Sequence, residues 1–298
     1  MVPVLTHYHA DLSINLDATR ASADHLLTAG FKTGAGALLA AGAGGDFPML
    51  SLEERQSVAK AILDVAGETI PVVVGAQDSD PRRIIAMAQF AEDAGAAAIQ
   101  MAPTYYYRAT ADDCRRLFEQ VHQATSSIGF MIYNTHWEGY DMPLSVVEEL
   151  AKFPRSVSLK WSSGEGTATY LRGVAKFADE MAVIDNHGLT VMNHMLGGTG
   201  YITHLASIWP EHELAVWKLL EQGEYKAAQT KITQANWPWY DFRVKMAGRT
   251  GAESPVVAAA MDLCGRYGGP SRPPARALNE DERSELRSVL QTIGVPGL

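Results

Sequence analysis

The stretch PVVVGAQDSDPRRIIAMAQFAEDAGAAAIQM, residues 71–101, decides the fold class. Its apolar run Pro71–Val74 is typical of a strand covered on both faces, and Ala97–Met101 repeats that pattern. Between them, the helical pattern Pro81–Ala94 begins at the dipeptide Asp80-Pro81, a common start signal. A strand, a helix and a second strand in this order predict a parallel βαβ unit.

The same alternation extends along most of the chain. Eight apolar runs are predicted as strands: Val2–Leu5, Ala37–Ala41, Pro71–Val74, Ala97–Met101, Ile128–Tyr133, Ser156–Lys160, Met181–Ile184 and Gly200–Thr203. The helical patterns between them include Leu16–Ala29, Leu52–Val65, Pro81–Ala94, Ala111–Thr125 and Pro143–Lys152. Eight strands, each followed by a helix, predict an α/β protein built as a (β/α)8 TIM barrel.

After Thr203 the pattern becomes helical. The predicted helices are Glu211–Leu220, Tyr225–Met246, Pro255–Cys264 and Glu280–Thr292. We therefore expect residues 1–210 to form a barrel catalytic domain and residues 211–298 to form a C-terminal helical extension. A doubly wound dinucleotide-binding sheet is disfavoured, because the first strand is followed by Thr6-His7-Tyr8-His9 and not by a GxGxxG turn.

Composition excludes several classes of protein. The chain has 298 residues, 47% hydrophobic and 20% charged, with a net charge of −9, which disfavours nucleic acid or an anionic membrane as a partner. Its two cysteines lie far apart, so neither a disulfide framework nor a cysteine metal site is expected. The N-terminus lacks the pattern of a signal peptide, and no apolar run reaches ~18 residues. We expect a cytoplasmic protein.

Lys160, at the end of the predicted strand Ser156–Lys160, is the main candidate for catalysis. Active sites of (β/α)8 barrels lie at the C-terminal ends of the strands, where Tyr133 and the turn Gly42–Gly45 are also expected. Burial favours the neutral amine, which attacks a ketone to form an imine, and a nearby phenol can transfer protons. The backbone N–H groups of a glycine-rich turn can bind a carboxylate. The alternative is a lysine that reaches solvent or pairs with Glu165.

Several segments also resemble a known family. The chain is similar to the dihydrodipicolinate synthase/N-acetylneuraminate lyase family of class I aldolases and dehydratases over essentially its whole length. Six segments carry this resemblance in the family's order: GAGGDFPMLSLEER (42–55), TYYYRAT (104–110), MIYN (131–134), VSLKWSSGE (157–165), GGTGYIT (197–203) and GGPSRPP with ALNEDERSELRSVL (268–274 and 277–290). Each segment alone is weakly specific, whereas their order and spacing together are strongly specific.

The resemblance implies roles for individual residues. Lys160 would form the Schiff base, Tyr133 would act as the general acid/base, and Tyr106 would belong to a proton relay across a subunit interface. The carboxylate of a 2-oxo acid would be held by the turn residues Ala43, Gly44 and Gly45, and the backbone of Ile202 would line the pocket. The resemblance further implies a homo-oligomer, a dimer or a tetramer. No cofactor and no metal are expected.

The chain departs from the family's pattern in the glycine-rich turn and in the segment after Tyr133, among other places. Ala43 and Gly44 replace two turn hydroxyls, so a proton relay through a turn threonine is absent. In the segment after Tyr133, dihydrodipicolinate synthases carry an arginine that holds the second substrate's carboxylate. This chain offers Glu138 and aromatic residues there, and Glu138 would repel that carboxylate. We consider His136 and Glu138 as a candidate acid/base pair at the C4 hydroxyl of the substrate. Asp185, Asn186 and His187, after the seventh predicted strand, could bind substrate hydroxyls.

These observations predict a Schiff-base-forming lyase that cleaves a 2-oxo acid to pyruvate or condenses pyruvate with an aldehyde. The alternative is a dehydratase of a 2-oxo-3-deoxy sugar acid that uses the same lysine imine. A metal-dependent barrel hydrolase would use the H-x-H pair His7 and His9, but the remaining ligands of such a site do not match. A non-catalytic protein that binds a 2-oxo acid is a further alternative.

Overall fold

Eight parallel strands alternate with helices in the computed structural model, which describes residues 1–298. The strands follow the order β1 to β8. The architecture is therefore the (β/α)8 barrel fold with a C-terminal helical part that the sequence predicts. The chain contains two compact units: the central unit, which comprises Met1 and residues 71–202, and the terminal unit, which comprises residues 2–70 and 203–298.

The central unit holds six strands that are largely buried. They are β3 (Val72–Gly75), β4 (Ala98–Met101), β5 (Gly129–Tyr133), β6 (Ser156–Trp161), β7 (Ala182–Asp185) and β8 (Gly200–Tyr201). Each strand pairs in parallel with the next. Their bounds agree with the predicted runs to within a few residues, because short runs of Val, Ile, Leu and Ala suit strands covered on both faces.

One irregularity interrupts the pairing of β5 with β6. Phe130 of β5 pairs with Ser156 of β6. The next residue of β5, Met131, pairs with Ser158, so Val157 is an extra residue on β6. The side chain of Val157 is half-exposed, whereas the strand is buried from Ser158 onward. A bulge of this kind shifts the alignment of every later pair along the two strands.

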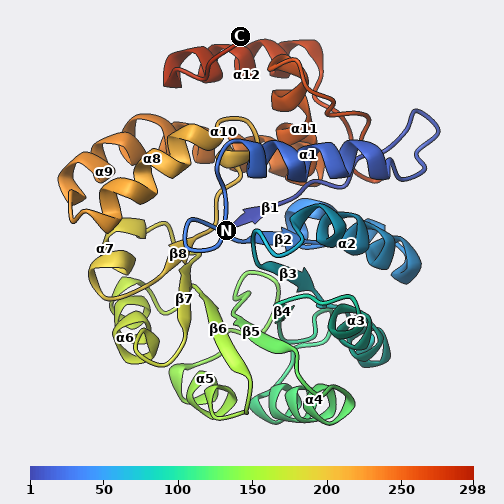
Figure 1. The fold of residues 1–298 in the computed structure, drawn as a ribbon, viewed down its shortest axis with the longest axis vertical. Helices are drawn as coiled ribbons and strands as arrows, with labels where there is room; N and C mark the ends of the chain where they lie inside the picture. Colours follow the sequence, from blue (N-terminus) through green and yellow to red (C-terminus); the bar gives the residue numbers. More distant parts are fainter. The chain divides into compact units, whose positions relative to one another are not determined.

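Five helices connect these strands and lie on their outer side (Figure 1). They are α3 (Pro81–Asp93), α4 (Ala111–Ala124), α5 (Leu144–Ala151), α6 (Thr167–Phe177) and α7 (Thr190–Met195). Side chains of Asp80 and Thr110 cap the first two, which begin where the sequence predicts. Helices α6 and α7 were expected from the alternation of strands and helices, but without predicted bounds. The first follows Gly166 without a side-chain cap, and the second has only 6 residues.

The terminal unit contains the first two strands. Strand β1 (Val2–Pro3) pairs in parallel with β2 (Leu38–Ala40), and the helices α1 (Leu16–Thr28) and α2 (Leu52–Ala66) pack against each other. Two short 3-10 segments, η1 (Ala43–Gly45) and η2 (Phe47–Met49), follow β2. Asn15 caps α1, and Ser51 forms a capping box with Glu54 at the start of α2.

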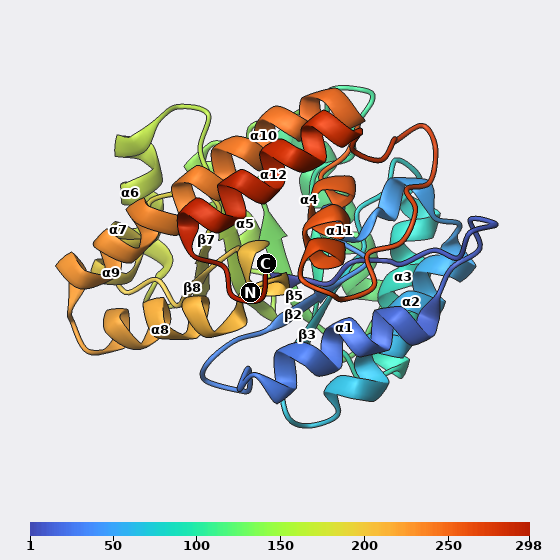
Figure 2. The same cartoon turned by 90° about the horizontal axis from the view of Figure 1, so that it is seen from above.

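The C-terminal helices of this unit share one hydrophobic core. Their bounds are η3 (Leu205–Ser207), α8 (Pro210–Glu221), α9 (Tyr225–Lys231), α10 (Trp237–Thr250), α11 (Ser254–Leu263) and α12 (Glu280–Ile293). Figure 2 shows α12 alongside α10, and residues such as Phe242, Met246, Leu286 and Leu290 are buried between these helices and α11. Burial of such side chains stabilises each by about 1.5–3 kcal/mol relative to exposure.

The helix predicted over Tyr225–Met246 forms, but it is not α-helical throughout. A π-helical segment, η4 (Ile232–Asn236), separates α9 from α10. Pro238 stands in the first turn of α10 and has no backbone N–H, so it cannot donate to the carbonyl four residues earlier. A π turn is one way to accommodate that missing bond.

Two further expectations concern the whole chain. The division into a barrel domain, residues 1–210, and an extension, residues 211–298, stays a prediction, although α8 begins at Pro210. None of the helices combines the length and the apolar character that a transmembrane helix requires.

Candidate active site

Lys160 and Tyr133 lie side by side at the C-terminal ends of β6 and β5. They are paired in register, and residues paired in this way project from the same face of a sheet. The Lys160 Nζ lies 3.9 Å from the centroid of the Tyr133 ring. Each residue is only 5% exposed. A lysine that reaches into solvent is therefore excluded, and the amine and the phenol are close enough to act on one substrate.

The residue after Lys160 explains why the lysine does not face the helices. Trp161 is fully buried, and its indole N–H donates to the carbonyl of Tyr170 in α6 at 2.9 Å. A Cβ atom at Gly173 of α6 would lie 2.6 Å from the indole nitrogen, so only glycine leaves room for this ring. Because successive side chains of a strand alternate between faces, Lys160 projects from the opposite face.

A hydrogen-bonded network joins the loop after β5 to the loop after β6. The carboxamide of Asn134 donates to Asp141 at 2.6 Å and to the carbonyl of Ser162 at 2.9 Å, and it accepts from the Met142 N–H. The second oxygen of Asp141 accepts from the Gly164 N–H at 3.1 Å. This network holds the segments on either side of the Tyr133–Lys160 pair. Sequence reasoning missed Asn134 and Asp141 as organising residues.

The candidate pair His136 and Glu138 is not brought together as an acid/base couple. No hydrogen bond or ion pair joins the two side chains, and Glu138 is exposed. His136 instead makes an edge contact with Trp137, with ring centroids 4.7 Å apart. The Trp137 ring also lies edge-on to Tyr133 at 6.3 Å. An aromatic side chain therefore stands next to the phenol.

His187 is held by the end of β7. Its ring stacks on Tyr170 at 4.5 Å with an interplanar angle of 12°. Burial lowers the pKa of His187, an effect that nearby Asp185 opposes and nearby His136 reinforces, so the imidazole is neutral at pH 7. The Asp185 carboxylate accepts hydrogen bonds from Tyr170, from the His187 N–H and from Thr190. Asp185 thus serves to position this loop.

The glycine-rich turn, in the terminal unit, is closely packed. A Cβ at Gly44 would lie 2.5 Å from a ring carbon of His204, and one at Gly45 would lie 2.9 Å from a backbone carbonyl. Thr6 donates to the carbonyl of Gly45 at 2.7 Å. The N–H groups of Ala43 and Gly44 donate to no other backbone group of the turn. The turn therefore requires glycine at two positions and presents two N–H donors.

Asp46, directly after this turn, is a buried carboxylate to which the sequence assigned no role. It has left-handed backbone geometry, with φ of 59°. Tyr8 donates to one of its oxygens at 3.2 Å, and Ser254 donates to the other. Burial raises the pKa of Asp46 to about 6, while hydrogen bonds from Ser254 and Tyr8 and the charge of Arg272 act in the opposite direction.

Tyr106 and Ile202 have contrasting environments. Tyr106 is 88% exposed in the loop after β4, where its ring meets that of Tyr107 edge-on at 5.2 Å. Its φ of 80° is rare for a residue with a side chain, and such geometry costs about 1–3 kcal/mol. Ile202 follows β8, and its N–H donates to the carbonyl of Asp185 at 3.0 Å. A relay through Tyr106 to a neighbouring subunit stays a prediction.

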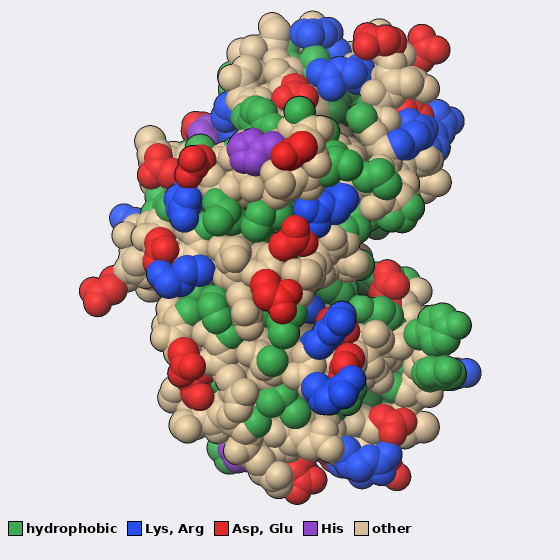
Figure 3. Space-filling view, turned by 90° about the vertical axis from the view of Figure 1, so that its right-hand side faces the viewer, with side chains coloured by type: hydrophobic (Ala, Val, Ile, Leu, Met, Phe, Trp, Pro, Cys, Tyr) green, Lys and Arg blue, Asp and Glu red, His purple; other side chains and the backbone are tan.

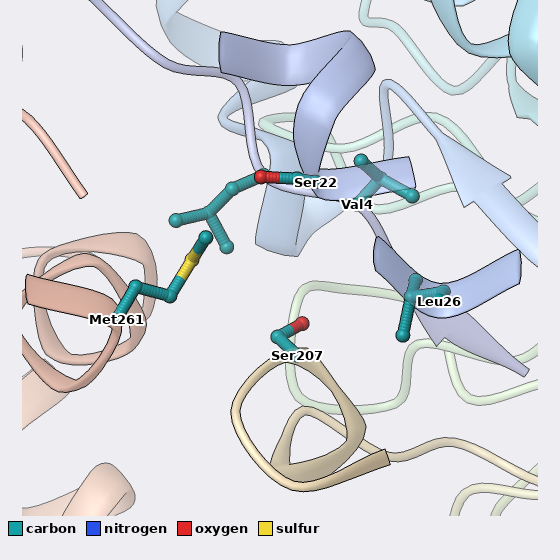
Figure 4. A pocket seen from close by; sticks show the side chains of 6 residues that line it. Val4, Ser22, Leu26, Ser207 and Met261 are labelled. Atoms are coloured by element: carbon teal, nitrogen blue, oxygen red, sulfur yellow. The ribbon is translucent and has the colours of Figure 1, made fainter. Parts of the chain in front are cut away.

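A cavity in the terminal unit and the face seen in Figure 3 offer no comparable constellation. In the terminal unit, a cavity of about 10 Å³ is lined by Val4, Leu5, Ser22, Leu26, Ser207 and Met261 (Figure 4). That volume suits a single water molecule and not a 2-oxo acid. On the face seen in Figure 3, acidic and basic side chains are interspersed among hydrophobic and neutral ones, with no extended region of one sign.

Comparison with known proteins shows which sequences this chain resembles. The model of the "Dihydrodipicolinate synthetase family" matches residues 1–293. "Putative 2-dehydro-3-deoxy-D-gluconate aldolase YagE" of Escherichia coli K12 is 28% identical over 302 residues, which span 98% of this chain and 95% of YagE. A 4-hydroxy-tetrahydrodipicolinate synthase of Neisseria gonorrhoeae is 27% identical over 299 residues, which span 99% of this chain and 98% of that enzyme.

Solved structures have the same fold. A crystal structure of YagE in complex with pyruvate matches with a TM-score of 0.82 and 25% identity over 99% of this chain and 98% of YagE. A dihydrodipicolinate synthase of Bacillus anthracis matches with a TM-score of 0.86 and 22% identity over 98% of this chain and 96% of that one. The second likeness concerns the fold alone. Together with the strand order, these matches confirm the predicted barrel fold.

Proposed function

The chain belongs to the dihydrodipicolinate synthetase family, and from this premise we propose that it is a class I aldolase in which Lys160 forms an imine with a 2-oxo acid. Members of the family are lyases, and so is this chain. The observation that carries the finer proposal is the contact between the Lys160 amine and the Tyr133 ring, 3.9 Å apart with both residues buried.

Imine formation proceeds from the neutral amine of Lys160. The amine attacks the C2 ketone carbon, and the carbinolamine that forms loses its hydroxyl group as water after protonation. Tyr133 is the group next to the amine that can deliver and recover this proton. The resulting iminium is positively charged and withdraws electrons from the adjacent bonds.

Cleavage of the C3–C4 bond then needs one base. Tyr133, as the phenolate, removes the proton of the C4 hydroxyl group, the C3–C4 electrons move to the iminium, and an aldehyde leaves. The enamine that remains takes up a proton at C3. Water hydrolyses the imine, which releases pyruvate and regenerates Lys160. Condensation of pyruvate with an aldehyde is the same sequence in reverse.

The remaining predicted residues have supporting roles in this proposal. The N–H groups of the turn Ala43, Gly44 and Gly45 are assigned to the carboxylate of the 2-oxo acid, and the backbone of Ile202 to the wall of its pocket. YagE is similar to this chain and was crystallised with pyruvate, which supports a 2-oxo acid as the substrate class. Assembly into a homo-oligomer, with Tyr106 near a neighbouring subunit, is likewise proposed.

Dehydration of a 2-oxo-3-deoxy sugar acid shares the imine but receives less support. Expulsion of the C4 hydroxyl group needs an acid at the leaving oxygen. The candidate couple His136 and Glu138 makes no mutual contact, so neither residue is oriented by the other for that task. A metal-dependent hydrolase would use His7, yet both ring nitrogens of His7 are engaged, by the carbonyl of Gly268 and the hydroxyl of Ser22.

Reductive trapping tests the proposal. We expect incubation with pyruvate and sodium borohydride to add one reduced pyruvyl group to Lys160, located by mass spectrometry of proteolytic peptides. Lys160→Arg is expected to abolish the adduct, whereas Lys152→Arg, a change in the turn before β6, is expected to leave it in place. Labelling that is absent from the wild type, or unaffected by Lys160→Arg, would refute the imine mechanism.

A reaction panel tests the type of lyase. Candidate 2-oxo-3-deoxy acids would be incubated with the protein, and pyruvate release would be followed with lactate dehydrogenase and NADH. Aldol cleavage is expected to produce pyruvate in proportion to substrate loss. Loss of substrate without pyruvate would favour the dehydratase.

A further inference from the structure

Gln100, the third residue of β4, is a fully buried amide without a partner in the polypeptide. Its exposure is 0%, and neither Nε2 nor Oε1 makes a hydrogen bond with a protein group. Buried side-chain amides are nearly always hydrogen-bonded, because an unsatisfied buried group costs about 1–3 kcal/mol. A small polar molecule could provide the hydrogen bonds that the protein does not give this side chain.

The strand register shows toward which face Gln100 projects. Gln100 pairs with Met131 of β5, and Met131 pairs with Ser158 of β6. Paired residues share a face, and so do residues two positions apart along one strand. Since Met131 precedes Tyr133 by two positions and Ser158 precedes Lys160 by two, Gln100 lies on the face of the catalytic pair.

Contacts on the other face support this assignment. Phe130, between Gly129 and Met131, contacts Phe118 of α4 with ring centroids 6.2 Å apart. Trp161, next to Lys160, contacts α6 through its indole N–H. The residues that alternate with Met131 and Lys160 therefore face the helices, and Gln100 faces away from them.

The residues in register with Gln100 are mostly small. In register with Gln100 on β3 stands Gly75, which has no side chain. Further along the same row, Ser158 is paired with Ala182, and the Ser158 hydroxyl already donates to the carbonyl of Ala182 at 2.7 Å. Met131 is the one long apolar side chain of this row. A water molecule suits the Gln100 carboxamide better than an apolar ligand, because the carboxamide needs hydrogen-bond partners.

Spacing connects Gln100 with Tyr133. Neighbouring strands lie about 4.8 Å apart and rise about 3.3 Å per residue, so a residue two positions along the next strand lies about 8 Å away. Gln100 and Tyr133 have this diagonal relation. One water can bridge a carboxamide and a phenol over such a distance.

We infer that Gln100 is a positioning residue that holds one ordered water against the hydroxyl of Tyr133; this role rests on the proposed aldolase function. The water donates to the phenolate oxygen while Tyr133 holds no proton, and it accepts from the phenol afterwards. Its other bonds go to Oε1 and Nε2 of Gln100, which fix its orientation. No bond of the substrate is broken by this water, and it acts only through Tyr133.

A crystal structure of the full chain at high resolution tests the inference directly. The expected result is a water within hydrogen-bond distance of both the Gln100 carboxamide and the Tyr133 hydroxyl, and its loss in Gln100→Leu. Absence of that water from the wild type, with Gln100 bonded to protein groups only, would overturn the inference. This readout does not depend on whether the protein forms an imine.

Stability and kinetics of Gln100→Leu give an independent test. Leucine removes the polar atoms and nearly keeps the volume, so unfolding in urea is expected to show stability equal to or above that of the wild type. The kcat is expected to fall about tenfold, with the pH-rate profile moved to higher pH and the KM for the 2-oxo acid little changed. Lower stability with an unshifted pH-rate profile would show a merely structural role and overturn the inference.

Controls separate this inference from the proposed function. Met101→Leu changes the next residue of β4, which faces the helices, and is expected to keep the wild-type kcat and pH-rate profile. Borohydride trapping with pyruvate is expected to label Gln100→Leu to the same extent as the wild type. If the wild type and Gln100→Leu are both trapped and have the same kcat, the inference about Gln100 fails while the aldolase proposal stands. If the wild type is not trapped, the aldolase proposal fails, and with it the role assigned to Gln100.

Discussion

Replacing Asp46 by asparagine is expected to stabilise the folded protein increasingly as the pH rises. The wild-type carboxylate is 4% exposed and loses most of its hydration on folding. Burial raises the pKa of Asp46 from 3.8 to about 6. Between these two values the folded state binds a proton that the unfolded chain has released, so wild-type stability falls as the pH rises through this window. Above this pH window, the buried charge of Asp46 lowers the stability of the folded protein by its full amount.

The size of the effect follows from the pKa change. A shift of about two pKa units corresponds to about 3 kcal/mol between the two ends of the window. Asparagine has no charge to bury, so its stability relative to the wild type is expected to grow by about 3 kcal/mol from about pH 4 to about pH 8. The amide cannot accept hydrogen bonds from both Ser254 and Tyr8, and this loss of about 1 kcal/mol is a constant offset across the pH range.

Urea unfolding followed by far-UV circular dichroism measures this difference. Wild type and Asp46→Asn would be compared at one protein concentration over the pH range, since association would change the apparent stability. The contributions of all other titrating groups to the pH dependence are the same in both proteins and cancel in the difference. Asp93→Asn, which removes a carboxylate at an exposed position at the end of α3, is the matched control. A pH-independent difference for Asp46→Asn would refute the reasoning about its burial.

Three further changes test the packing and the site. Gly173→Ala places a Cβ 2.6 Å from the Trp161 indole nitrogen and is expected to lower stability by about 1–3 kcal/mol in thermal unfolding; an unchanged Tm would contradict the close packing. Gly44→Ala places a Cβ 2.5 Å from His204 and is expected to raise the KM for the 2-oxo acid, as measured by steady-state kinetics; an unchanged KM would argue against the turn as a carboxylate site. Tyr133→Phe is expected to lower kcat about 10²–10⁴-fold while leaving the Lys160 adduct detectable by mass spectrometry, and full activity would exclude Tyr133 as the acid/base.

Strand positions were the most predictable part of the fold. Apolar runs of four to six residues mark all eight strands, because a strand that is covered on both faces has few polar side chains. Helices with a capping side chain, such as α3 after Asp80, were predicted with nearly correct bounds. Helix α6, which follows Gly166 without such a cap, was expected from the strand–helix alternation but without bounds. The π segment precedes Pro238, which has no backbone N–H. The spacing of apolar residues does not show which turn of the helix changes its hydrogen bonding because of that proline.

The candidate site was predictable where one residue carries the chemistry. Lys160 at a strand end and Tyr133 at the next were identified from barrel geometry and from the resemblance, and the structure places them in contact. Contacts between distant segments were not predictable: Asp46 is bonded to Ser254, 208 residues away. The sequence did contain one signal for Gln100, since a glutamine inside the apolar run Ala97–Met101 is unusual for a buried strand.

The extra residue on β6 decides which side chain meets Tyr133. With Ser156 opposite Phe130 and no extra residue, the count along both strands would set Leu159 opposite Tyr133 and turn the lysine toward α6. Because Val157 is unpaired, Ser156 can pair with Phe130 while Lys160 pairs with Tyr133. Shortening β6 by removing Val157 would preserve that alignment, whereas removing Leu159 would misplace the amine. Single-residue deletions at neighbouring positions would thus have opposite outcomes.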